Sequence, residues 1–170
     1  LAAPKRILDS ISQWWETNSQ NKCLPQLFGT EKPDLLVNWL KQQKGLSIVL
    51  ASGDPLWFGI GRKLLEHFPK SNLEFHPAPS SFQLAFSRLG ISWQNTSWGS
   101  LHGRDPSLLI EILKKRPASL VVLTDPNNGG AEEVRKILNS IGLINSYQFW
   151  VCEQLGHPKE RIRQLMPKEK

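Results

Sequence analysis

The chain has 170 residues, of which 39% are hydrophobic and seven are tryptophan, so it can bury a core as one domain or as two small α/β halves. Lysine and arginine outnumber aspartate and glutamate by 21 to 15, a net charge of +6, which suits either a polyanionic partner or a solvated helix face near the C-terminus. Neither a signal-peptide pattern nor an apolar run of the roughly 20 residues that cross a bilayer is present, so we expect a cytoplasmic protein without membrane contact.

The first half of the chain alternates short apolar runs with helical segments. Residues 1–15 are typical of a loop that leads into an amphipathic helix, so we expect the opening strand of an α/β fold to be missing from this chain. The remaining pattern predicts a short strand over 22–28, a helix over 32–43, a strand buried on both faces over 46–51, a helix over 56–68 and a strand over 72–76.

The second half continues the same alternation. The pattern predicts a helix over 82–90, a strand within 95–104, a helix over 105–115, a strand over 119–124, a helix over 132–141 and a strand over 148–153. Strands that alternate with helices favour parallel sheets with right-handed crossovers. The predicted fold class is therefore α/β, with two α/β/α halves over 1–95 and 96–170 and mainly parallel sheets.

The most informative junction is the sequence SGDPLWFGIG over 52–61, which reads as a strand, a sharp turn and a helix start. Asp54 can cap the helix, and Pro55 suits its first position. Gly59 and Gly61 each cost roughly 1 kcal/mol inside a helix, which implies that something approaches the backbone closely. Tight packing and a bound ligand are both open explanations.

Two further strand-to-helix junctions follow. Ser80 and Ser81 precede a helix whose first turn would suit a carboxylate or a ribose hydroxyl, although a plain serine cap explains them as well. The loop DPNNGG over 125–130 follows an apolar strand. Because ligands of open α/β sheets bind at the carboxyl ends of strands, these loops are candidate ligand-binding segments.

Several catalytic signatures are missing from the sequence, including GxGxxG, GxxxxGK[ST], HExxH, CxxC and GxSxG. The two cysteines lie far apart and are expected to be buried free thiols, and the four histidines are scattered, so we expect no metal site. His102 is the histidine of interest, because it lies in the turn SLHGR beside Gly103 and Arg104.

The segments SGDPLWFGIG, PAPSSFQLAFSRLG, WQNTSWGSLHGR, the loop after SLVVLT and CEQLGHPKERI, in this order and spacing, resemble the tetrapyrrole methylases from about residue 22 to residue 163. The resemblance implies a C-methyltransferase that uses S-adenosylmethionine, bound in a cleft between the two halves, to methylate C5 of a precorrin macrocycle in cobalamin biosynthesis. Attack by an electron-rich ring carbon needs positioning more than acid–base chemistry, so no catalytic residue is assigned.

Carried over by position, the resemblance implies three groups of cofactor contacts and one of substrate contacts. The implied cofactor-binding residues are Gly53, Asp54 and Trp57 on the methionine side, Ser81 and Phe82 at the second junction, and Thr124 and Asp125 near the adenosine. His102 and Arg104 are the candidate substrate-binding residues, since arginine suits the many carboxylates of the macrocycle.

The same resemblance suggests a homodimer and a partner subunit that methylates C15 and decarboxylates the substrate. Two alternatives remain open at this point: a noncatalytic or inactive truncated α/β subunit, and a basic nucleic-acid-binding module. Nucleic-acid binding requires basic residues concentrated on one face with exposed aromatic side chains. The charges of this sequence are dispersed instead, so no nucleic-acid partner is expected.

Overall fold

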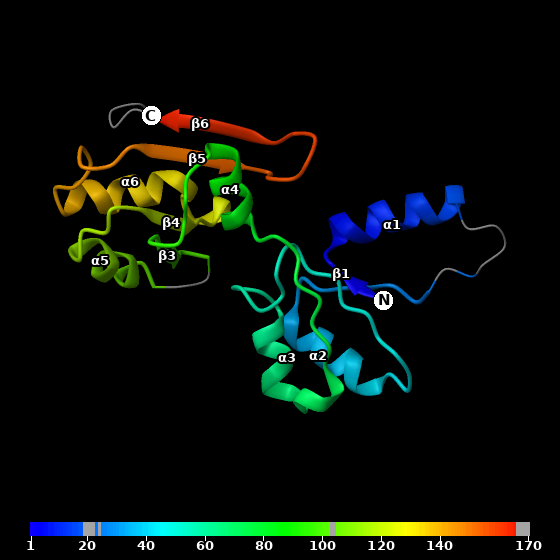
Figure 1. Ribbon diagram of the computed structural model, residues 1–170. Coiled ribbons are helices and arrows are strands. Elements are labelled where there is room, and N and C mark those ends of the chain that lie inside the picture. Colours follow the sequence, from blue (N-terminus) through cyan, green and yellow to red (C-terminus); the bar gives the residue numbers. More distant parts are fainter. Residues whose placement is uncertain (19–22, 24, 103–104, 166–170) are drawn as a thin grey trace. The chain divides into compact units, whose positions relative to one another are not determined.

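The computed structural model of the chain describes residues 1–18, 23, 25–102 and 105–165 (Figure 1). By compactness it divides into two units, Leu1–Ser80 and Ser81–Lys170. Helix α4 (Ser81–Leu89) therefore belongs with the second unit, although it lies before the boundary that the sequence suggests between residues 95 and 96. That boundary between functional halves stays a prediction.

The first unit is built on short parallel backbone pairings. Its elements are β1 (Ala2–Ala3), α1 (Lys5–Asn18), β2 (Phe28–Gly29), α2 (Pro33–Gln42), α3 (Gly61–His67) and the 3₁₀ helix η1 (Lys70–Asn72). Strand β1 pairs in parallel with β2, with Ala2 opposite Phe28, and Ala2 also forms a parallel bridge with Val49. Because backbone lies on both sides of it, Ala2 is 0% exposed.

The opening of the chain corrects one expectation, because Ala2–Ala3 form a strand where a loop was predicted. The strand predicted over 46–51 is reduced to the single bridge at Val49, in which Ala2 N–H donates to Ile48 O at 2.8 Å and Leu50 N–H donates to Ala2 O at 2.8 Å. Its burial on both faces was also wrong, since Leu46 is 95% exposed. An apolar, β-rich composition favours extended backbone, but burial depends on which elements cover it.

Two further predictions for this unit were wrong. The strand predicted over 72–76 does not form, because η1 ends at Asn72 and residues 73–80 are irregular. The helix predicted over 56–68 begins only at Gly61. By contrast, the helix predicted over 32–43 is confirmed as α2, which buries Leu36 and Val37.

The second unit follows the predicted alternation more closely. Its elements are α4, β3 (Ser97–Ser100), α5 (Ser107–Lys114), β4 (Leu120–Leu123), the 3₁₀ helix η2 (Pro126–Asn128), α6 (Gly130–Ser140), β5 (Phe149–Glu153) and β6 (Arg161–Leu165). Strands β3 and β4 are parallel, as predicted, while β5 and β6 form an antiparallel pair. The α-helices and strands from α4 to β5 lie where the sequence predicted elements of the same kind.

Strand β6 is the strand that the sequence analysis missed in the second unit, because its basic residues suggested a solvated helix face. Arg161 and Arg163 instead lie on the same side of an edge strand. Their guanidinium groups lie 3.4 Å and 3.2 Å from Oε2 of Glu153 on β5. The two arginines thus neutralise one carboxylate across the strand pair, a cross-strand charge arrangement that stabilises antiparallel pairing.

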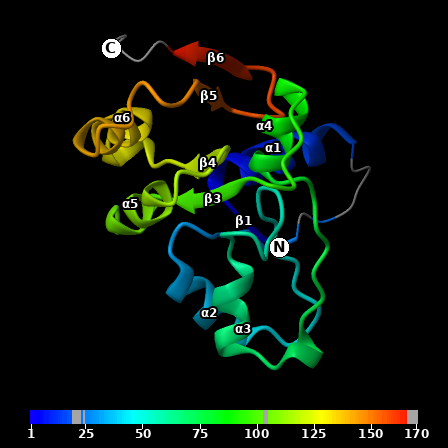
Figure 2. The same ribbon diagram turned by 60° about the vertical axis from the view of Figure 1, so that its left-hand side comes forward.

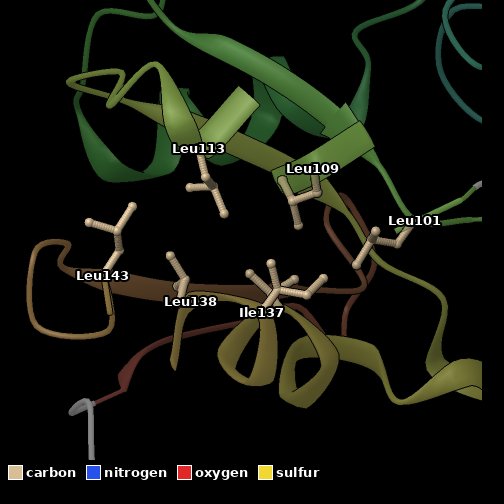
Figure 3. Close-up of a cluster of buried hydrophobic side chains, with 7 residues drawn as sticks. Leu101, Leu109, Leu113, Ile137, Leu138 and Leu143 are labelled. Carbon is tan, nitrogen blue, oxygen red and sulfur yellow. The ribbon is translucent and has the colours of Figure 1, made fainter. Parts of the chain in front are cut away.

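The core of the second unit lies between α5 and α6. Figure 3 shows the side chains of Leu109 and Leu113 on α5 pointing toward Ile137 and Leu138 on α6. The whole cluster comprises Leu101, Leu109, Leu113, Val134, Ile137, Leu138 and Leu143.

Among the described residues, no helix combines the length and the apolar character needed to span a membrane.

Truncation of this core tests the fold directly. Leu113 is 1% exposed, so Leu113→Ala should lower the free energy of unfolding by about 2–5 kcal/mol, because it removes apolar contacts and leaves a cavity. Leu108→Ala on the same helix is the control, since Leu108 is 53% exposed. Urea unfolding followed by circular dichroism measures both variants. Equal losses from the two substitutions would contradict the assigned core.

Candidate functional site

Two of the predicted junctions meet backbone to backbone within the first unit. Gly53 has a φ of +74°, and a Cβ atom on it would lie 3.1 Å from Ser80 Cα and 3.3 Å from Pro79 O. Only glycine adopts this conformation at so close an approach without strain. The structure therefore brings residues 52–55, which we call the SGDP turn, against the segment that leads into α4. The first residue of α4, Ser81, directly follows Ser80 in the chain.

Asp54 shapes a turn and does not cap a helix directly, which corrects the sequence prediction. Its Oδ1 accepts a hydrogen bond from Leu56 N–H at 2.8 Å, as in an Asx turn. The helix is delayed because Phe58 has a φ of +51°, which a right-handed helix does not allow. Pro55 O then accepts a hydrogen bond from Gly61 N–H at 2.8 Å, and α3 begins there.

The glycines after this turn pack against the chain itself. A Cβ atom on either Gly59 or Gly61 would lie 2.6 Å from Pro55 O, and one on Gly61 would also lie 3.0 Å from Phe75 Cε1. Of the two explanations that the sequence left open, the structure thus supports close packing for these glycines. A larger side chain at either position would push the turn away from α3.

The turn presents aromatic surface beside Asp54. Trp57 is 37% exposed and Phe58 is 38% exposed, and their rings meet edge to face with centroids 5.4 Å apart. Indole rings attract cations through their negative faces, and a carboxylate attracts them by charge. This end of the first unit can therefore hold a ligand group that is cationic and partly apolar.

At the second junction, residues 80–82 at the start of α4, the backbone is better placed to contact a ligand than the side chain of Phe82. Ser81 is exposed at the first turn of α4, whereas Phe82 is 8% exposed and packs its ring inside. A ligand contact at position 82 would therefore fall to the backbone. Backbone groups at a helix N-terminus are suited to carboxylates and hydroxyl groups.

In the second unit, the carboxyl ends of two neighbouring strands bring His102 and Asp125 together. Ser100 on β3 pairs with Leu123 on β4, and Leu101 N–H donates to Leu123 O at 2.8 Å. Nδ1 of His102 lies 3.7 Å from Oδ2 of Asp125, and the imidazole is 65% exposed while the carboxylate is 10% exposed. The histidine thus faces solvent with an anionic carboxylate beside it.

Asp125 organises the loop that follows β4. Its Oδ1 accepts from Asn127 N–H at 3.0 Å, and its Oδ2 accepts from the side-chain amide of Asn128 at 2.7 Å. These hydrogen bonds, first that of Asn127 and then that of Asn128, lower the pKa of Asp125, and the nearby His102 adds to the effect. Asp125 therefore shapes the loop after the half-buried Thr124.

Four residues near the predicted site remain to be described: two lie outside the described part of the chain, and two are serines whose role the sequence analysis did not foresee. Gly103 and Arg104 lie outside the described residues. The sequence analysis treated Ser80 only as a possible cap and passed over Ser100, whose Oγ accepts from His102 N–H at 3.3 Å. Both serines are nearly buried, and the only sequence signal for them was their place at strand and loop ends.

The described part of the chain contains no group of three or more histidine, cysteine, aspartate or glutamate residues that could hold a metal ion. The thiols differ from the expectation of burial, because Cys23 is exposed and Cys152 is only half-buried. Burial and the neighbouring carboxylate of Glu160 raise the pKa of Cys152.

Gly53→Ala tests the close approach at the SGDP turn. The positive φ and the contact with Ser80 should make this variant about 1–3 kcal/mol less stable. Gly45→Ala is the matched control, because no atom lies within 4 Å of a Cβ built at Gly45. Chemical unfolding of both variants measures the difference. A Gly53→Ala variant as stable as Gly45→Ala would show that the turn does not have this backbone conformation.

The pKa of Asp125 predicts a pH dependence of stability. Because folding lowers this pKa, the ionised carboxylate stabilises the fold above the ordinary aspartate value of about 3.9, and this stabilisation is lost as the pH falls through the folded-state pKa. Asp125→Asn should therefore unfold at a lower temperature than the parent chain at neutral pH, with a gap that narrows in acid. Thermal unfolding from neutral to acidic pH measures this gap, and a constant gap would refute the assignment.

Comparisons with known proteins identify the family. The profile of the tetrapyrrole (corrin/porphyrin) methylases matches residues 5–167. The precorrin-6Y C(5,15)-methyltransferase (decarboxylating) of Sinorhizobium sp is 36% identical over 115 residues, which cover 68% of this chain and 27% of that protein. The cobalt-precorrin-7 C(5)-methyltransferase of Salmonella typhimurium is 33% identical over 133 residues, covering 76% of this chain and 63% of that protein.

A solved structure agrees at the level of the fold. The precorrin-6Y methylase of Archaeoglobus fulgidus aligns with 98% of this chain and 75% of its own, at a TM-score of 0.59 and 22% sequence identity. The matches to the two curated relatives span about a quarter and less than two thirds of those proteins. On the match over residues 5–167, the chain belongs to the tetrapyrrole (corrin/porphyrin) methylase family.

Proposed function

We propose that this chain is an S-adenosylmethionine-dependent methyltransferase that methylates C5 of a precorrin macrocycle in cobalamin biosynthesis. The observation that carries the proposal is the family match over residues 5–167. The names of the relatives from Sinorhizobium and Salmonella supply the substrate class and the methylated position.

The residues of the SGDP turn fit the methionine end of the cofactor. Gly53 lets the backbone of Pro79 and Ser80 pack against the turn, and Leu56 N–H orients the carboxylate of Asp54. S-adenosylmethionine carries an ammonium group and a sulfonium, so the anionic Asp54 and the exposed indole of Trp57 match its charges. When bound, the cofactor supplies a methyl group activated on its sulfonium.

The remaining cofactor contacts are assigned to the loops that begin α4 and follow β4. Ser81 and the main chain at Phe82 would contact the cofactor from the N-terminal turn of α4. Thr124 and the loop organised by Asp125 would lie near the adenosine, with Asp125 fixing the loop through Asn127 and Asn128. In this role Asp125 determines where backbone groups are placed.

The substrate side of the proposal falls on His102 and Arg104. A precorrin carries many carboxylates, and the imidazole of His102 is exposed and held beside Asp125. Arginine binds carboxylates through two parallel N–H donors. Binding at these positions would orient the macrocycle, and such positioning of a carbon nucleophile in line with the transferred methyl supplies most of the rate in this type of reaction.

Other parts of the hypothesis are predictions of the same kind. They are a homodimer, a partner subunit that methylates C15 and decarboxylates the substrate, and a cytoplasmic location.

Calorimetric titration with S-adenosylhomocysteine tests the proposal. We expect a dissociation constant in the micromolar range, or about −8 kcal/mol, and Asp54→Asn should weaken it at least about tenfold, because the change removes the charge and keeps a side-chain acceptor for Leu56 N–H. The control is Asp9→Asn on the exposed side of α1, which should bind like the parent chain. A folded parent chain without affinity for S-adenosylhomocysteine would refute the proposed function.

A further inference from the structure

The loop between β5 and β6 is fastened to helix α4 by one glutamate. Oε1 of Glu160 accepts a hydrogen bond from Arg88 Nε at 2.7 Å, and Oε2 accepts one from Gly156 N–H at 2.7 Å. Figures 1 and 2 both show this loop beside α4 within the second unit. We call the set Leu84, Arg88, Gly156 and Glu160 the α4 clasp.

An apolar contact reinforces the two hydrogen bonds. A Cβ atom built on Gly156 would lie 3.6 Å from Leu84 Cδ1, so the loop backbone passes close to the helix surface. Leu84 and Arg88 are four residues apart and therefore lie on the same face of α4. The loop thus contacts one face of the helix at two successive turns.

The clasp differs from the other ion pairs of the second unit. Among its described residues, the other pairs that an arginine or lysine makes with a carboxylate join neighbours within one helix or join β5 to β6. Arg88 and Glu160 are 72 positions apart and connect two separate elements. Their side chains are 43% and 22% exposed, so the pair is only partly screened by solvent.

Glu160 is ionised at neutral pH. The loop that carries it is held by hydrogen bonds within its own turns. The hydrogen bond of Arg88, followed by that of Gly156, lowers the pKa of Glu160. Within the loop, His157 N–H donates to Gln154 O at 3.0 Å and Glu160 N–H donates to His157 O at 2.8 Å. Hydrogen bonds to ionised partners are shorter and stronger than neutral ones, so Glu160 holds Arg88 from a well-defined position.

The clasp acts on α4 together with the helix's buried side chains, Phe82, Ala85 and Phe86, because no regular element leads into the helix. Residues 73–80 are irregular, so no preceding strand fixes where α4 begins. An α-helix advances 1.5 Å per residue, which puts the N-terminal turn roughly 10 Å from Arg88. A helix of this length moves as a rigid rod, so a contact near its C-terminal end also determines where Ser81 and Phe82 lie within the unit.

We propose that Glu160 is a positioning residue, which acts through Arg88 and Gly156 to hold the N-terminal turn of α4 in the place required for cofactor binding. This inference rests on the proposed function, which assigns Ser81 and Phe82 to the cofactor. Glu160 itself touches neither cofactor nor substrate in this account. Its effect is on the affinity of the folded protein for the cofactor.

The test uses the full chain and S-adenosylhomocysteine as the probe. Glu160→Gln, Arg88→Gln and the double variant are titrated by calorimetry well below their unfolding temperatures. Each single variant should weaken binding by about tenfold, and the double variant should be no weaker than either single one, because both remove the same contact. Glu153→Gln is the matched control, since the ion pairs of Glu153 join β5 to Arg161 and Arg163 on β6 and do not involve α4.

An amide NMR spectrum separates positioning from stabilisation. In the parent chain and in Glu153→Gln, the probe should shift the amide signals of Ser81 and Phe82; in Glu160→Gln these shifts should shrink or disappear. A purely stabilising role would lower the unfolding temperature and leave the affinity and the shifts unchanged, which would overturn the proposal. Should Glu160→Gln fail to fold, Arg88→Gln provides the same readout, because Glu160 then keeps its bond to Gly156.

The outcomes distinguish this inference from the function on which it rests. A folded parent chain without affinity for the probe overturns the proposed function, and the assigned role of Glu160 with it. A parent chain that binds while Glu160→Gln and Arg88→Gln bind equally well overturns the role of Glu160 alone. Independent, additive losses in the double variant would also contradict a shared clasp.

Discussion

The parallel pairing of β3 with β4 is the constraint on which the candidate site in the second unit depends. Parallel strands cannot be joined by a tight turn, so the chain must cross over through a helix, here α5. The crossover buries the leucines of α5 against α6 and places both strand ends at the same edge. His102 and Asp125 meet there because each follows one of the two strands.

The first unit reaches a similar arrangement with much less regular structure. Ala2 pairs in parallel with Phe28 on one side and with Val49 on the other. The SGDP turn begins shortly after Val49 in the chain. The turn is then fixed by hydrogen bonds and by glycines that fit against Pro55 and Ser80. The loops that carry the proposed function are therefore shaped by their own backbone contacts in the first unit and by strand pairing in the second.

Polar residues in these loops serve first to set the shape of the chain. Asp54 and Asp125 each accept a hydrogen bond from the backbone N–H two residues later. Such bonds shape a turn, because the carboxylate replaces backbone hydrogen bonds that a helix would otherwise provide. Glu160 joins separate elements instead, by accepting hydrogen bonds from Arg88 on α4 and from Gly156 N–H in the loop between β5 and β6. Under the proposed function, residues of this kind would place the groups that contact the ligand.

The sequence predicted the second unit well because its signals are local. Apolar strands, helices and a glycine-containing loop alternate there, and the start of α4 was also correctly placed, although the strand predicted before it does not form. The first unit was harder, because the positive φ of Phe58 delays α3 in a way that residue preferences do not reveal. The opening strand was missed because two alanines carry no strand signal and acquire their structure from the segments beside them.

The tertiary features of the site were less accessible from sequence. That His102 and Asp125 follow strands was predicted, but the hydrogen bonds of Asp125 and the 3.7 Å approach of His102 depend on the fold. The pair of Arg88 and Glu160 spans 72 positions, and a single sequence contains no signal for such a contact. Strand β6 was missed because its alternation is carried by arginines, whose role became clear only beside Glu153.

Hydrogen–deuterium exchange with and without S-adenosylhomocysteine tests the central claim most directly, because it reports on every loop at once in the full chain. The account predicts that the ligand slows exchange in residues 52–61, at the start of α4 and in residues 124–130, with little change in the α5 and α6 core. Protection confined to other segments, or no protection at a saturating concentration, would contradict the claim that these three loops bind the cofactor.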